Sequence, residues 1–309
     1  HGVYSRSPNR VHHFMIASLA LLLAATQAPV VSAPLTNIRY EVSFTRELAS
    51  RRHLGVAMEF DVSTAGDVVL SLPAWTPGAY EMTWFARWVS NFTPTTDGKP
   101  LTWDKVDFDT WRIRAGGAKH VRVAFEFQAD SLDNAMAWSR SDFAFFNGTN
   151  VFLYPEGRAL DFPAAVRVKT ESDWRVVTGM RPGTDRDSYA EKNFHDLVDM
   201  PFFVGQFDYD SARVGNTTIR LATYPAGQLG GEARSAFWKQ YQTMFSPQGK
   251  VFGEIPFPTY TTFMVFDSAF GAARRWSTRT RTSASTPRRG SGRSGWRRSR
   301  RTRSPMPGT

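Results

Sequence analysis

The sequence predicts a mainly β protein: a β-sandwich-like domain, then the opening of an α/β or α+β domain, then an arginine-rich tail. Three observations predict this order. Short alternations of apolar and polar residues recur between residues 35 and 225. The first convincing helical pattern follows them, at residues 231–245, and the chain contains no Lys, Asp or Glu after Phe270. Many strands followed by a helix and another strand indicate two successive domains, of which the second is incomplete.

The first 33 residues have the pattern of a secretory signal. Residues 15–33 carry no charge and include the apolar run 16–25. They end in the small-x-small sequence Val31-Ser-Ala33, which is typical of a cleavage site. A transmembrane anchor is the alternative, but the run is shorter than the roughly 20 residues needed to span a bilayer. We therefore expect residues 1–33 to be upstream residues and a signal peptide, with no transmembrane anchor after cleavage and an exported, periplasmic or secreted product.

Residues 34–207 are predicted to form the β-sandwich-like domain. Apolar and polar residues alternate in 38–44, 56–62 and 121–127, as expected for half-buried strands. Asp97-Gly98 and Gly116-Gly117 are turn signals. Further strands are expected at Trp103, at 111–113, at 151–154 before a Pro-Glu-Gly turn, and at 202–204. Strands are also expected at 166–168 and 174–177, and these two are expected to pair with each other.

Residues 208–270 are predicted to begin a second domain. A strand is expected at 218–222 and another at 260–266. Between them, apolar residues recur every four positions, which predicts a helix over 231–245. The sequence Ser246-Pro-Gln-Gly249 is expected to close that helix.

The tail, residues 271–309, holds 12 Arg and no Lys, Asp or Glu. Its remaining residues are mostly Ser, Thr, Gly, Pro and Ala, so it is expected to be disordered. These 12 arginines exceed the formal charge of +10 of the whole chain. The folded part is therefore not basic, and no specific nucleic-acid partner is expected.

The residues offer little recognisable chemistry. The chain has no cysteine, and its imidazoles beyond the signal are His53, His120 and His195. None stands in the His-Glu-x-x-His spacing that places two imidazoles on one helical face for zinc. His195 and Asp199 come nearest, but one such pair indicates a surface role more than a metal site. The sequence therefore nominates no catalytic, cofactor-binding or metal-binding residue.

Four collinear segments carry a family resemblance. The segment 72–87, Leu-Pro-Ala-Trp-Thr-Pro-Gly-Ala-Tyr-Glu-Met-Thr-Trp-Phe-Ala-Arg, resembles a stretch of the amino-terminal domain of the M61 metallopeptidases, the glycyl aminopeptidase family. Residues 111–113, 194–207 and 252–260 resemble later segments of the same family in the same order. Apart from the resemblance, Pro73, Pro77 and Gly78 indicate a rigid turn between strands, after which the aromatic series is expected to fill the sandwich interior.

The resemblance implies an exported zinc-dependent aminopeptidase with a thermolysin-like α+β catalytic domain after the β domain. Its substrates would be peptides with Gly or Ala at the amino terminus, and a downstream PDZ module is common. Zinc would be held by a His-Glu-x-x-His helix and a later Glu. No residue of this chain matches those positions, so we expect this chain to bind no zinc and to be inactive as given.

The break after Phe270 has an explanation in the genetic code. Permitted codons for Arg275-Trp-Ser-Thr278, read in a shifted frame, give Leu-Glu-His, which the family has at this point. We therefore interpret the tail as out-of-frame translation rather than a genuine basic tail. Two other functions stay open: a non-enzymatic exported module that binds carbohydrate or peptide through an aromatic-rich sheet, and a polyanion binder that acts through the tail.

Overall fold

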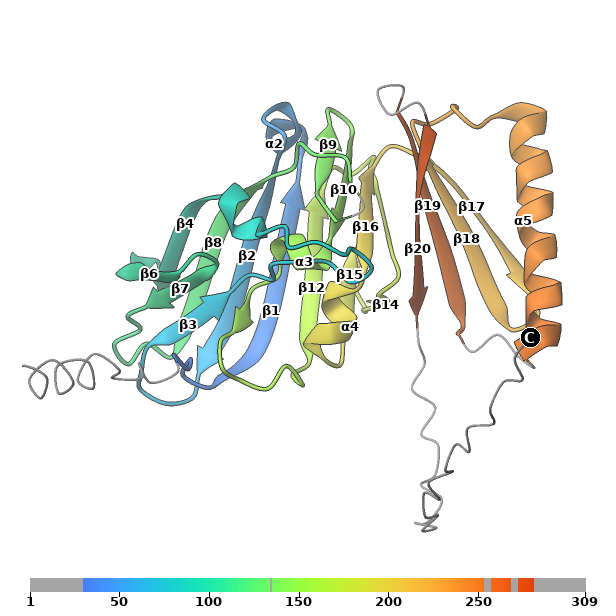
Figure 1. Ribbon diagram of the computed structural model, residues 1–309. Coiled ribbons are helices and arrows are strands. Elements are labelled where there is room, and N and C mark those ends of the chain that lie inside the picture. Colours follow the sequence, from blue (N-terminus) through green and yellow to red (C-terminus); the bar gives the residue numbers. More distant parts are fainter. Residues whose placement is uncertain (1–29, 134, 253–256, 268–271, 281–309) are drawn as a thin grey trace, which may run out of the picture.

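The computed structural model describes residues 30–133, 135–252, 257–267 and 272–280, and strands dominate it (Figure 1). The predicted mainly β class is confirmed. The strands form four sheets, which we call the large, short, middle and terminal sheets. The predicted signal, residues 1–29, and the end of the tail, residues 281–309, lie outside the described residues.

The large sheet has the strand order β14-β15-β12-β1-β2-β8-β4-β5. The alternating segments predicted from the sequence form its centre, as β1 (Leu35–Phe44), β2 (His53–Val62) and β8 (His120–Gln128). Its remaining strands are β4 (Val89–Thr96), β5 (Lys99–Pro100), β12 (Ala164–Thr170), β14 (Arg181–Pro182) and β15 (Ser188–Glu191). Neighbours pair antiparallel except β1 and β12, which run parallel.

Two smaller sheets lie against one face of the large sheet. The short sheet has the order β11-β3-β7-β6 and the middle sheet the order β13-β16-β10-β9. The short sheet consists of β3 (Val68–Ser71), β6 (Trp103–Asp107), β7 (Thr110–Ile113) and β11 (Tyr154–Pro155). The middle sheet consists of β9 (Trp138–Arg140), β10 (Phe143–Asn147), β13 (Arg175–Thr178) and β16 (Pro201–Gly205).

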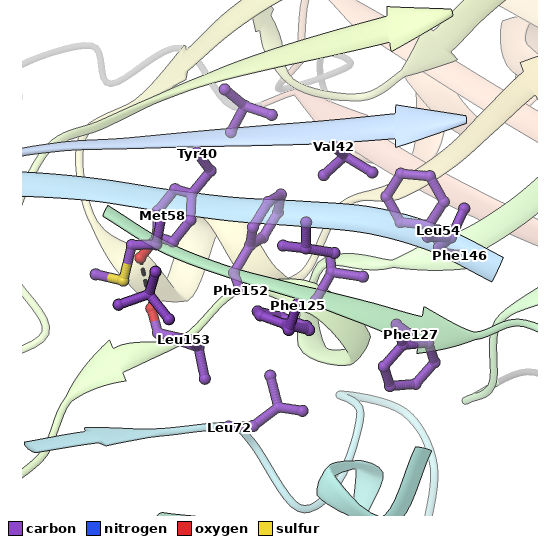
Figure 2. Packing of buried hydrophobic residues seen from close by; sticks show 14 of the residues in the cluster. Tyr40, Val42, Leu54, Met58, Leu72, Phe125, Phe127, Phe146, Phe152 and Leu153 are labelled. Atoms are coloured by element: carbon purple, nitrogen blue, oxygen red, sulfur yellow. Dashed lines mark hydrogen bonds between the residues drawn. The ribbon is translucent and has the colours of Figure 1, made fainter. Parts of the chain in front are cut away.

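The main core fills the space between these layers (Figure 2). Phe127 and Leu54 from the large sheet pack with Phe146 from the middle sheet, and all three are fully buried. Tyr40 shows how polar atoms are accommodated there: its hydroxyl donates to the carbonyl of Leu153 at 2.6 Å. A buried hydroxyl without such a partner would lose its bond to water and destabilise the fold.

The middle sheet is buried on both faces. Because strand side chains alternate between faces, β10 and β16 each contribute to two different cores. One face joins the main core through Ala144, Phe146, Phe202 and Val204. The other face joins a second core, with the terminal sheet, through Phe143, Phe145 and Phe203. Burial on both sides explains why these two strands are continuous apolar runs rather than alternating ones.

The terminal sheet, β17-β18-β19-β20, covers the outer face of the middle sheet, and helix α5 (Gly231–Phe252) covers the terminal sheet (Figure 1). Its strands are β17 (Asp208–Val214), β18 (Thr217–Tyr224), β19 (Thr259–Asp267) and β20 (Ala272–Thr280). Phe263 packs on Phe203 at 4.5 Å between ring centroids. On the opposite face, the hydroxyls of Tyr241 in α5 and Thr262 in β19 lie 2.7 Å apart.

The other helices are short: α2 (Arg46–Ser50), η1 (Phe85–Trp88), α3 (Gly148–Val151) and α4 (Phe194–Val198). Of the helices in the described part of the chain, none has both the length and the apolar character needed to cross a membrane.

Two strand predictions were wrong. Residues 151–154 do not form one strand, because Asn147 and Asn150 make a reciprocal capping box that starts helix α3, and only Tyr154 enters a strand. The expected pairing of 166–168 with 174–177 was the second error. Strand β12 pairs with β1 and β15, whereas β13 pairs with β16. Trp174, which directly precedes β13, packs against Phe44 at the end of β1, with 5.3 Å between their ring centroids.

Two boundary predictions were wrong near the end of the chain. Helix α5 continues to Phe252 instead of ending before Ser246, although Pro247 inside it has no backbone N–H to donate to the helix. The expected disorder from residue 271 is contradicted for β20, which pairs antiparallel with β19 along its whole length. Backbone pairing to an existing strand is open to most sequences, and Trp276, Thr278 and Thr280 belong to residue types that favour strands.

Candidate functional site

A cavity of about 810 Å³ lies between the turn after β3 and helix α4. Figure 1 shows the segment from β3 to η1 extending across the front of the sheets towards α3 and α4. The cavity is lined by Pro73, Ala74, Trp75, Pro77, Asp109, Thr149, Tyr154, Leu160, Glu191, Phe194, His195, Asp196, Val198, Asp199 and Met200. Two segments that lie more than a hundred residues apart, 72–87 and 194–207, therefore meet around one cavity.

The first wall is the turn that follows β3. Prolines 73 and 77 fix the backbone there, and the chain closes on itself where the backbone amides of Thr83 and Trp84 both donate to the carbonyl of Ala74, at 2.7 and 2.9 Å. The hydroxyl of Thr76 reaches the hydroxyl of Thr149 in α3 at 2.6 Å. Hydrogen bonds therefore hold the turn where its ends meet, at Ala74, and at its middle, at Thr76. They fix the position of Trp75 in the cavity wall.

The opposite wall is α4. Its amino-terminal cap, Asn193, accepts from the backbone amide of Asp196 at 2.8 Å and donates through its side-chain amide to the Asp196 carboxylate at 2.9 Å. Gly148 allows α3 to approach this helix closely, because a Cβ at that position would lie 2.7 Å from the carbonyl oxygen of Leu197. The backbone contact between α3 and α4 therefore sets where His195 and Asp196 lie.

A polar network borders the cavity on the side of the short sheet. The Ser71 hydroxyl lies 2.7 Å from the hydroxyl of Thr110 and donates to the Glu156 carboxylate at 2.6 Å. The pKa of Tyr154 is raised to about 12. Burial is the largest cause, and the nearby carboxylates of Glu156 and Asp109 add to the shift. Tyr154 is thus a neutral hydroxyl at physiological pH.

The titratable side chains of the lining are mostly acidic. Four carboxylates, those of Asp109, Glu191, Asp196 and Asp199, line the cavity together with His195, and the lining contains no Lys or Arg. Glu191 is buried and pairs with Arg181 at 3.1 Å. The remaining lining combines Trp75 and Phe194 with aliphatic side chains, so the cavity is apolar in part and rich in hydrogen-bond acceptors.

The expectation that the aromatic series after the turn fills the interior was wrong for most of its members. Phe85 is fully buried, but Tyr80 is completely exposed and Trp84 is 41% exposed. The backbone bonds to Ala74 hold this stretch as a surface loop, so its side chains do not alternate between core and solvent. Trp84 has a positive φ of 56° and packs edge-on against the exposed ring of Phe108 at 5.7 Å.

The three imidazoles named from the sequence are not brought together. His53 contacts the carbonyl of Arg51 at 2.5 Å, His120 pairs with Asp61, and His195 stands on α4. Within the described residues, no three His, Cys, Asp or Glu side chains are grouped so that they could hold a metal ion. The side chains that the structure describes therefore do not offer the set of about three protein ligands that a catalytic zinc takes.

The sequence missed Asp109 and Tyr154 as lining residues. Both belong to the short sheet or its turn, and only the folding of β7 and β11 against β3 brings them beside Trp75. The family resemblance singled out segments 72–87 and 194–207, but nothing in the sequence indicated that the two segments are neighbours in the folded chain.

Comparison with known proteins identifies the domain that carries this cavity. Residues 39–206 match the family described as the peptidase M61 N-terminal domain. No curated protein matches the chain. Among solved structures, an aminopeptidase N family protein from Idiomarina loihiensis shares the fold, with a TM-score of 0.65 and 22% identity over 72% of this chain.

More distant similarities were also found. An M1 zinc metallopeptidase from Deinococcus radiodurans aligns over 77% of this chain with 14% identity and a TM-score of 0.40. Yeast LTA4 hydrolase aligns over 81% with 11% identity and a TM-score of 0.39. The chain spans 38% of the Idiomarina protein, 57% of the Deinococcus protein and 42% of the yeast protein.

The family match runs from β1 to the end of β16 and contains both walls of the cavity. It covers more than half of the chain, and the expected resemblance is confirmed. This chain belongs to the peptidase M61 family, and residues 39–206 are its M61 N-terminal domain.

Proposed function

We propose that this chain is the β domain and the first catalytic-domain elements of an exported, zinc-dependent aminopeptidase. The complete enzyme would remove amino-terminal residues, with Gly or Ala the expected preference, from peptides. The observation that carries the proposal is the family match, which contains the two segments that enclose the cavity. The chain itself is proposed to be inactive, because neither its sequence nor its described side chains supply a zinc-ligand set.

The proposal extends to the reading frame. The zinc-binding helix of the family would follow β19, where this chain instead continues into the arginine-rich segment. We take that segment to be out of frame, and we take residues 1–33 to direct export. The coding DNA downstream of codon 270 tests the frame directly: a shifted His-Glu-x-x-His supports the proposal, and its absence from all frames contradicts it.

Activity is tested by a paired assay. The chain as given and a frame-restored, extended protein are purified and compared on aminoacyl reporter substrates, with metal analysis of each. The extended protein is expected to bind about one zinc and to release amino-terminal residues in a chelator-sensitive reaction. Chelator-sensitive turnover by the chain as given would contradict the proposed inactivity.

A second candidate function is favoured by the exposed aromatic side chains of the surface loop and of Phe108, in the β6–β7 turn that packs against it. Trp75 is 48% exposed, Trp84 is 41% exposed and Phe108 is 54% exposed. Aromatic rings held at a surface can bind carbohydrate or peptide without any catalysis. This function would be favoured if this chain and the frame-restored enzyme bind carbohydrate or peptide with equal affinity, and if that binding does not depend on turnover.

A further inference from the structure

We propose that Ser32 and Ala33 belong to the mature β domain, and that the signal peptide is removed upstream of them, after Ala28. This proposal rests on the proposed function for export alone, and it assigns a proteolytic processing site to the chain. The sequence pattern predicts a cut after Ala33 instead, at the end of Val31-Ser-Ala33. Burial, hydrogen bonds and one close backbone approach all place residues 32 and 33 inside the folded domain.

Ser32 and Ala33 are buried in the folded chain. Ser32 has no exposed surface, and Ala33 is 7% exposed and belongs to the main core. Val30 and Val31 are 37% and 44% exposed, so the enclosed part of the segment begins at Ser32. A signal peptide is absent from the mature protein and cannot be a part of its core. A cut after Ala33 would therefore remove two residues that the domain encloses.

Ser32 forms hydrogen bonds with two parts of the short sheet. Its backbone amide donates to the carbonyl of Glu156, directly after β11, at 2.9 Å. Its hydroxyl accepts from the backbone amide of Val69 in β3 at 3.1 Å, and its carbonyl accepts from Nε of Arg158 at 2.7 Å. Removal of Ser32 would take a bonding partner from all three groups, which destabilises the folded state.

The residues after Ser32 continue into the large sheet without a break in bonding. The backbone amide of Ala33 donates to the carbonyl of Asp67 at 2.9 Å, and the carbonyl of Pro34 accepts from the backbone amide of Ser63 at 3.1 Å. Strand β1 then begins at Leu35. The bond between residues 33 and 34 therefore lies within one continuously bonded stretch, where the domain has no boundary.

Gly157 allows the chain to pass closely just upstream of Ser32. It has a positive φ of 68°, and a Cβ at this position would lie 3.0 Å from Cγ2 of Val31 and 3.2 Å from the carbonyl oxygen of Val30. Glycine adopts this backbone conformation without strain and leaves room for both valines. The contact between the segment and the domain therefore extends upstream to Val30.

A second small-x-small sequence lies ahead of this segment. Thr26-Gln-Ala28 follows the apolar run 16–25 and places small residues three positions and one position before the bond between Ala28 and Pro29. A signal peptidase of this specificity hydrolyses that peptide bond. Water supplies a hydroxyl group to the carbonyl carbon of Ala28 and a hydrogen to the nitrogen of Pro29. The mature chain would therefore begin with the secondary amine of Pro29 and keep residues 30–33.

The exported product tests the processing site. The full chain, with an initiator methionine, is expressed in a bacterium, and the protein outside the cytoplasm is identified by amino-terminal sequencing and intact mass. We expect it to begin at Pro29. Ala28→Glu should abolish this product, because a large charged side chain replaces the small residue before the bond. Val31→Glu makes the same kind of change in Val31-Ser-Ala33 and should leave the product unchanged.

Thermal unfolding tests whether Ser32 and Ala33 belong to the domain. Chains that begin at Pro29 and at Pro34 are purified and compared. The longer chain should unfold at a midpoint at least about 4 °C higher, because the shorter one lacks the hydrogen bonds of Ser32 and Ala33. Ser32→Ala should lower the midpoint of the longer chain. Ser211→Ala, the same change at an exposed position of β17, should leave it unchanged.

Several results would overturn the proposal: an exported product that begins at Ala33 or Pro34, an exported chain that keeps its signal peptide, or equal unfolding midpoints of the two purified chains. A chain retained inside the cell contradicts the proposed export instead, and the unfolding midpoints then decide the proposal alone. Neither measurement depends on peptidase activity. Failure of this proposal is therefore distinguishable from failure of the proposed function.

Discussion

At the scale of single residues, Phe203 lies at the centre of the second core. It is fully buried, and its ring lies 4.7 Å from that of Phe143 and 4.5 Å from that of Phe263. Phe203→Ala should lower the free energy of unfolding by about 3–5 kcal/mol, because the cavity cannot collapse between two sheets. Denaturant unfolding measures this, with Met244→Ala on the exposed face of α5 as the control, expected within about 0.5 kcal/mol of wild type.

Tyr154 gives a prediction for alkaline pH. Its pKa in the folded chain is raised to about 12 from an ordinary value of 10.0, so the unfolded chain releases this proton more readily. The stabilisation is complete below pH 10 and is lost as the pH rises through about 12. Denaturant unfolding between pH 9 and pH 12 should show a decline that Tyr154→Phe makes shallower. An identical decline in both proteins would contradict the assigned cause.

Residue burial was predictable only where the backbone is regular. In β1 and β8 the period-two pattern correctly separates the buried positions from the others, and in β2 it fails at Ala57, which is buried, and at Val62, which is only partly buried. After Pro73 the same reasoning fails, because Tyr80 and Trp84 lie in a loop whose backbone bonds decide which way each side chain points. Composition alone cannot distinguish an aromatic residue that fills a core from one that a turn holds in solvent.

At the scale of secondary-structure elements, the contact between α3 and α4 sets one wall of the cavity. Gly148→Ala would place a methyl group 2.7 Å from the carbonyl oxygen of Leu197 and must push the helices apart. We expect a loss of about 2 kcal/mol or more in the free energy of unfolding. Denaturant unfolding measures this.

Gly215→Ala is the matched control for Gly148→Ala. Gly215 has a φ of 59°, but no atom lies within 4 Å of the place that the added methyl group would take. Only backbone strain of about 1 kcal/mol is therefore expected. Equal losses of stability from the two substitutions would contradict the role given to the α3–α4 contact.

Element type was more predictable than element pairing. The helix at α5 and most strands follow from local periodicity. The parallel pairing of β1 with β12 depends on contacts between residues more than a hundred positions apart. The assignment of β13 to the middle sheet depends on aromatic packing at Trp174. The cavity shares this property, since β3, α3 and α4 must all be in place before it exists.

At the scale of the whole molecule, the predicted boundary at residue 207 separates two sheets that share a core. Phe207 itself packs with Phe143 and Phe203, Tyr224 stacks on Phe143 at 3.9 Å, and the Tyr224 hydroxyl donates to Asp142 at 2.9 Å. We therefore expect one calorimetric unfolding transition for the two parts, which Phe203→Ala lowers as a whole. Two separate transitions, of which only one responds to the substitution, would contradict this.

The sandwich-like class could be predicted from the alternation of apolar and polar residues, and the family from the four collinear segments. Both patterns can be recognised in a single sequence. The position of the cavity could not, because segments 72–87 and 194–207 carry no signal of their spatial partner. The charge of the cavity was hidden for a related reason: the formal charge of +10 is dominated by the tail, whereas the lining is acidic.

The double-sided burial of the middle sheet has a consequence for biosynthesis. Strands β10 and β16 leave the ribosome before β18 and β19, so Phe143, Phe145 and Phe203 have no covering layer while the nascent chain is shorter than about 265 residues. An apolar sheet face that waits for its cover attracts holding chaperones and invites association between nascent chains. Translation that stalls between β16 and β19 should therefore leave this protein most dependent on such chaperones.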